Sequence, residues 1–220
     1  MMDLQSLILT IALYAIPMLF AITLHEAAHG YAAKYFGDYT AYQAGRISLN
    51  PLDHIDLFGT ILVPVGLLIF TSGQFVFGWA KPVPINFGNL REPKRDMFWV
   101  AAAGPGANML MALAWAAILK GTLLLPETSL SYPVQEMSSG GVLINLGLMV
   151  LNLIPVPPLD GSKVLEAILP HSLAYGYGEW RRRMEYQPFL GMLIVLLIIF
   201  LLGGAFSTFV YSIASGIAGM

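Results

Sequence analysis

Three residues near the end of the first apolar segment, His25, Glu26 and His29, form an HExxH motif. Histidines at positions i and i+4 lie on one face of a helix, so both imidazoles can bind a single Zn²⁺ ion. A glutamate beside them can take a proton from a metal-bound water and later pass it to a leaving amine. The alternative interpretation, a polar cluster or anchor at a helix end, needs three such residues at this spacing by accident.

A hydrolytic zinc site needs a third protein ligand and an open position for water. The chain has no cysteine, so this ligand must be a histidine, an aspartate or a glutamate. Asp160 is the candidate, because it ends a later apolar segment in the run Pro-Pro-Leu-Asp-Gly. Asp-Gly is also a common turn dipeptide, and without the HExxH motif that simpler interpretation would be preferred.

The composition places these residues in a membrane protein. The chain is 57% hydrophobic and 11% charged, whereas a soluble domain carries about 25% charged residues. Its only run of charge, residues 181–183, is typical of a cytoplasmic anchor, and no basic tract for nucleic acid is present. Ionisable residues deep in an apolar helix are costly and are functional candidates by default. The predicted surroundings are therefore the lipid bilayer, with no nucleic-acid partner.

Four apolar segments are long enough to span a bilayer, at residues 4–35, 97–119, 139–158 and 189–209. A fifth, at 57–72, is short and broken by glycine and proline, which favours a re-entrant element. Residues 42–50 have the pattern of a strand, and the Pro-rich stretch 79–96 that of an extended loop or edge strand. The sequence predicts one all-α polytopic membrane domain over residues 1–220, with about four transmembrane helices, a re-entrant segment and a small β-hairpin or edge-strand element.

The distribution of basic residues tests this topology. With segment 57–72 re-entrant, ten of the eleven Lys and Arg residues fall on one side of the membrane, and Lys120 falls on the other. The excess marks that side as cytoplasmic. The same arrangement makes segments 4–35 and 139–158 run in the same direction, so His25, His29 and Asp160 reach the same face. Charge bias and metal geometry thus favour the same topology.

Further motifs carry a family resemblance. The run NLIPVPPLDG at residues 152–161 and GPGAN at 104–108, together with the HExxH motif, resemble the site-2 protease family of intramembrane zinc metalloproteases. Residues 45–51 and 78–84 are similar to its compact bacterial and archaeal branch, so the resemblance covers nearly all of residues 20–170. No appended PDZ or CBS domain is seen, although many relatives carry one.

The resemblance implies one Zn²⁺ per chain, held by His25, His29 and Asp160, with Glu26 as the general base. It also implies a transmembrane or membrane-anchored protein substrate, and a multi-pass location in a prokaryotic cell membrane with the active site toward the cytoplasm. Asn152 is similar to a family residue that holds the substrate or the developing oxyanion, and an amide can donate to an anionic oxygen in a dry site. Interhelical packing is an equally good interpretation of Asn152.

Two other residues have weaker assignments. We expect Asn108 to be structural, with Gly104 and Gly106 allowing close helix approach and the amide bonding across the contact. His54 can either line the active site or lie in a loop without a role.

The predicted function is an intramembrane zinc endopeptidase of the regulated-proteolysis type. A helical substrate has its carbonyls tied up in i→i−4 bonds and must unwind locally. We hypothesise that residues 42–50 or 82–87 supply an edge that pairs with the unwound chain. The alternatives are a metal-ion carrier, which uses the same cluster as a transit site, and a catalytically inactive membrane scaffold.

Overall fold

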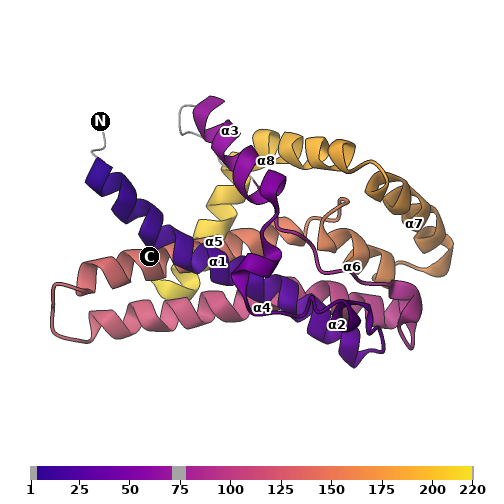
Figure 1. The fold of residues 1–220 in the computed structure, drawn as a ribbon, viewed down its shortest axis with the longest axis horizontal. Helices are drawn as coiled ribbons and strands as arrows, with labels where there is room; N and C mark the ends of the chain where they lie inside the picture. The colour runs from indigo at the N-terminus through magenta and orange to yellow at the C-terminus, as the bar shows by residue number, and fades with distance from the viewer. Residues whose placement is uncertain (1–3, 71–77, 220) are drawn as a thin grey trace.

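The computed structural model describes residues 4–70 and 78–219 of the chain (Figure 1). Every regular element within these residues is a helix. The elements are α1 (Leu4–Tyr35), α2 (Thr40–Gln43), η1 (Pro51–His54), η2 (Leu57–Leu62), α3 (Val63–Phe70), η3 (Phe87–Asn89), α4 (Pro93–Leu123), α5 (Ser131–Asn152), α6 (Asp160–Ile168), α7 (His171–Glu185) and α8 (Pro188–Ala218).

Three helices, α4, α5 and α8, are long and apolar enough to cross a membrane. The sequence predicts about four such helices, and α1 makes the difference. It is a single helix of 32 residues that includes the HExxH motif. The side chains of residues 4–12 lie outside the described part of the structure.

The core of the bundle lies where α4, α5 and α8 meet. Small side chains recur at the contacts, with Ala112 and Ala116 on α4 and Ala214 and Ala218 on α8, all at most 5% exposed. Without water to drive apolar association inside a bilayer, helices depend on close packing, and alanine allows their backbones to approach. Leu146 of α5 is fully buried among them.

The helix directions bring distant parts of the chain to one end of the bundle. In Figure 1, α4 and α5 form an antiparallel pair joined by a loop, and α1 crosses both. The chain therefore runs in the same direction along α1 and α5, and α6 follows at the end where α1 finishes. This places the HExxH half of α1 beside the start of α6.

The predicted β-hairpin or edge-strand element is not confirmed, because no strand is found among the described residues. Residues 40–43 form α2, and the chain then turns through Gly45 at φ 65°, where Arg46 N–H bonds to Ala41 O at 2.9 Å. Residues 79–86 are extended, and within the described residues no strand lies alongside them. Their backbone groups bond to separate partners instead, so no ladder forms: Lys81 N–H donates to His54 O at 2.9 Å.

The predicted re-entrant segment 57–72 is helical as far as Phe70, and its last two residues lie outside the described part of the chain. It consists of the π-helix η2, with six residues, and α3, with eight. Together they cover 14 residues, whereas a span needs about 20. Whether the segment re-enters the bilayer stays a prediction.

One buried carboxylate fixes the extended segment to the end of α1. Asp38 is fully buried and accepts hydrogen bonds from Thr40 N–H at 3.1 Å, Asn86 N–H at 2.7 Å and Asn89 Nδ2 at 3.0 Å. Burial raises the pKa of Asp38. These hydrogen bonds lower it by more, so the net pKa lies below its ordinary value of 3.8. Asp38 thereby holds residues 86–89 over the second half of α1.

We expect Asp38→Ala to lower the midpoint of thermal unfolding by several degrees, because each lost bond to a charged acceptor is worth about 1.5–3 kcal/mol. Circular dichroism in detergent measures this shift. Since folding lowers the pKa, the stabilisation is complete above the ordinary carboxylate pKa of 3.8 and is lost as the pH falls through the folded-state pKa. Asp53→Ala, which removes an exposed carboxylate, is the control. Equal midpoints for the two variants would contradict this role.

Candidate active site

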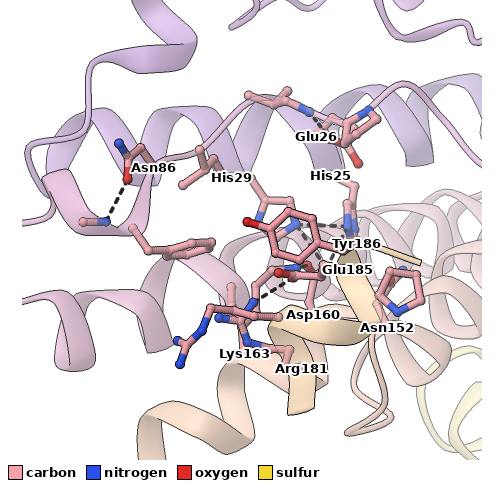
Figure 2. A pocket seen from close by; sticks show the side chains of 18 residues that line it. His25, Glu26, His29, Asn86, Asn152, Asp160, Lys163, Arg181, Glu185 and Tyr186 are labelled. Atoms are coloured by element: carbon pink, nitrogen blue, oxygen red, sulfur yellow. Dashed lines mark hydrogen bonds and ion pairs between the residues drawn. The ribbon is translucent and has the colours of Figure 1, made fainter. Parts of the chain in front are cut away.

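Three ligand atoms from two helices converge at the end of the bundle (Figure 2). His25 Nε2 and His29 Nε2 lie 3.1 Å apart on α1. Asp160 Oδ2, on the first residue of α6, lies 3.2 Å from the first nitrogen and 3.1 Å from the second. The two histidines are buried, at 7% and 6% exposure. Residues 135 positions apart in the chain therefore form one compact cluster.

The partners of the other imidazole nitrogens decide the protonation of this cluster. His29 Nδ1 lies 2.7 Å from the backbone carbonyl oxygen of Val100, which can only accept, so Nδ1 carries the proton. His25 Nδ1 lies 2.5 Å from Asn108 Oδ1. In its neutral form each ring then turns the lone pair of Nε2 toward Asp160, which is the arrangement of metal-binding histidines.

The cluster fits a zinc ion. When both histidines are neutral, two imidazole lone pairs and a carboxylate oxygen point at one another, which is a set of ligand atoms that a zinc ion accepts. Ligand atoms at about 2.0–2.1 Å from a tetrahedral zinc are separated by roughly 3.3 Å, close to the three distances of this triangle. A set of three protein ligands also leaves the fourth position open, as in hydrolytic zinc sites.

The space for this site depends on a glycine of α4. A Cβ added to Gly104 would lie 2.3 Å from His29 Nε2 and 2.6 Å from His25 Nε2. The expectation that Gly104 allows close helix approach is therefore confirmed. The same expectation is wrong for Gly106, where an added Cβ meets nothing within 4 Å.

Asp160 is positioned by the turn that precedes α6. A Cβ on Gly161 would lie 2.3 Å from Leu153 O, so glycine allows α6 to start against the end of α5. Lys163 Nζ lies 3.7 Å from Asp160 Oδ1. Burial raises the pKa of Asp160. A positive charge on His29 and the hydrogen bonds with both histidines lower it by more, so the net pKa lies well below its ordinary value. The carboxylate is thus held ionised, as a metal ligand must be.

The ligand cluster lies in a cavity of about 770 Å³. Glu26 lines it, and its Oε2 accepts from Val83 N–H of the extended segment at 2.9 Å. Asn152 also lines it, with its Nδ2 donating to Leu148 O at 3.0 Å. The remaining wall includes Pro82, Ile85 and Phe87, which belong to a segment hypothesised to pair with substrate. It also includes residues that the sequence did not single out for this site: Lys163, Arg181, Glu185 and Tyr186.

The geometry decides between the two interpretations of His54, and it adds a contact to the expected bond of Asn108 across the helix contact, which is made to Ala21 O. His54 does not line the cavity; it is 2% exposed, and its Nε2 lies 2.9 Å from Ser48 O. Asn108, expected to be structural, contacts His25 directly. The GPGAN motif pointed to Asn108, but nothing in the sequence pointed to the backbone carbonyl of Val100, since any residue supplies one.

We expect Gly104→Ala to weaken zinc binding by at least about tenfold, because the new Cβ would displace both imidazoles. Chelator competition on the purified protein measures the dissociation constant. Gly106→Ala is the matched control, because it lies in the same motif with open space around it and should bind zinc like the wild type. Equal zinc affinities for the two variants would contradict the proposed spatial role of Gly104.

Comparison with known proteins assigns the family. The chain is 34% identical over 188 residues to "Putative zinc metalloprotease YwhC" of Bacillus subtilis (strain 168), which covers 83% of this chain and 78% of that protein. It is 30% identical over 158 residues to "Putative zinc metalloprotease Rip2" of Mycolicibacterium smegmatis, covering 70% of this chain and 54% of that protein. No protein-family model matches, and no solved structure matches significantly. With its motifs and these relatives, the chain belongs to the site-2 protease family of zinc metalloproteases.

Proposed function

We propose that this protein is an intramembrane zinc endopeptidase that hydrolyses peptide bonds of transmembrane or membrane-anchored substrates. The observation that carries the proposal is the convergence of His25, His29 and Asp160 in a cavity at the end of a bundle of apolar helices. The names of the relatives support metalloprotease activity, and the apolar helices support the membrane location.

Zinc held by these three residues supplies Lewis-acid chemistry, polarising a carbonyl and acidifying water. Glu26 takes a proton from the attacking water as its oxygen bonds to the scissile carbonyl carbon. The same carboxyl then gives that proton to the amide nitrogen as the C–N bond breaks, so no proton is lost from the cycle. The position of Glu26 on the cavity wall, one residue from His25, supports this role.

Asn152 is proposed to donate a hydrogen bond to the carbonyl oxygen as negative charge develops on it. Its support is that it lines the cavity while bonding to its own helix through one amide hydrogen, at Leu148 O. An amide nitrogen carries two hydrogens, so the second is available to a substrate.

The proposed orientation places the cavity toward the cytoplasm. Much of the cavity wall comes from α6, α7 and residues 82–88, which belong to none of the three candidate spans. Most basic residues of the chain lie at this end, among them Lys94, Lys163 and Arg181. Water needed for hydrolysis can therefore enter from the loop side without crossing hydrocarbon.

The substrate is proposed to bind in an extended form beside residues 82–87. All of these residues except Pro84 line the cavity, and no strand of the described chain pairs with them, which supports backbone pairing with an unwound chain. The earlier candidate, residues 42–50, is excluded because it forms no strand.

Glu26→Gln should abolish cleavage of a test transmembrane substrate while the protein still binds about one zinc ion. The amide keeps the shape of the side chain but cannot accept the proton. Zinc content and cleavage by purified protein in detergent measure the two properties separately. Asp160→Ala should lose both, because it removes a metal ligand. A metal-ion carrier would keep much of its transport in Glu26→Gln, and cleavage at the wild-type rate by this variant would overturn the proposal.

Substrates with Gly, Pro or Asn near the scissile bond should be cut faster than a matched Leu-rich segment, because they unwind more easily. The ratio of kcat/KM for two substrates that differ only at these positions measures the effect. Equal kcat/KM values for the two substrates would show that unwinding is not required before cleavage.

A further inference from the structure

A chain of buried hydrogen bonds connects three helices to one of the predicted metal ligands. It runs from Asn145 on α5 through Asn108 on α4 to His25 on α1. Both asparagines are fully buried. Burying an amide costs free energy unless all of its groups are bonded, so such residues need a reason to be retained.

The direction of this chain is fixed by two backbone carbonyls, which can only accept. Asn145 Nδ2 donates to Gly141 O at 2.8 Å, so the oxygen of that amide must face Asn108. Asn108 Nδ2 donates to this oxygen at 3.0 Å and to Ala21 O at 3.2 Å. Both amide hydrogens of Asn108 are therefore used, and its amide cannot be turned over without losing both bonds.

The consequence falls on His25. The oxygen of Asn108 lies 2.5 Å from His25 Nδ1, and an oxygen can only accept. The proton of His25 must then sit on Nδ1, which leaves the lone pair of Nε2 for a metal. His29 reaches the same state through the carbonyl of Val100, so α4 sets the tautomer of both histidines.

We infer that Asn108, held in one orientation by Asn145, is a positioning residue that fixes the tautomer and ring orientation of His25 for metal binding. The inference rests on the proposed zinc site. It assigns the GPGAN asparagine to the metal centre rather than to helix packing alone. Partners of this kind on ligand histidines change metal affinity by roughly 10- to 100-fold.

Three variants test this inference through zinc affinity, measured by chelator competition on the purified protein. Asn108→Ala removes the acceptor and should weaken zinc binding roughly 10- to 100-fold. Asn108→Asp keeps an acceptor for His25 and should bind zinc more tightly than Asn108→Ala, even where it melts at a lower temperature. Ser138→Ala removes a fully buried hydroxyl of α5 that makes no hydrogen bond, and it should leave zinc affinity unchanged.

Unfolding in EDTA separates a packing role from a positioning role. If Asn108 only packs helices, Asn108→Ala lowers the melting temperature of the metal-free protein and leaves the zinc dissociation constant at the wild-type value. That result overturns the inference. It differs from failure of the proposed function, in which the wild type itself binds no zinc.

A measurement on the wild type covers the case in which Asn108→Ala does not fold. The ¹⁵N spectrum of zinc-loaded protein labelled at its four histidines should contain two zinc-bound imidazoles. Both should carry the proton on Nδ1 and bind through Nε2. A zinc-bound imidazole ligated through Nδ1 overturns the inference.

Discussion

Two imidazole nitrogens and a carboxylate oxygen must be held within 3.2 Å of one another at this site if they are to share one cation. The two histidines are buried, so the helices around them fix where each ring points. The rest of the structure is arranged around this constraint. One helix brings two ligands on a single face, another begins with the third, and a third helix orients the imidazoles and leaves room for the ion.

That third helix, α4, contributes through positions spaced four residues apart. Val100, Gly104 and Asn108 lie on one face of the helix. The carbonyl of Val100 accepts from His29, and the amide oxygen of Asn108 accepts from His25. Gly104, between them, leaves space for both imidazoles. Each contribution differs in kind, so no single property such as hydropathy would reveal the set. Zinc affinity thus depends on the register of α4 against α1, which the small-residue contacts of the bundle hold in place.

Much of the site could be predicted from the sequence because its ligands are residue types with few other uses at that spacing. The pattern of His25, Glu26 and His29 indicates a metal site, and Asp160 is the carboxylate in the matching later motif. Contacts made through backbone atoms, such as Val100 O, have no residue signature. The strand expected at residues 42–50 failed for another reason: a strand needs a partner, and a local pattern of side chains cannot supply one. Asp38 was missed because its four donors come from residues up to 51 positions away.

The position of the site at the end of the bundle follows from two opposed requirements. A metal cluster gains strength from a buried setting, because its electrostatic interactions weaken in water. Peptide hydrolysis consumes water and needs a polar path to the same cluster. The structure meets both by placing His25 and His29 in the last turns of α1, against the apolar bundle, and closing the other side with α6, α7 and the extended segment. Because Val83 N–H holds the carboxylate of Glu26, the extended segment is tied to the predicted base as well as to the cavity wall. A substrate that enters beside this segment must therefore approach the base and the metal ligands together.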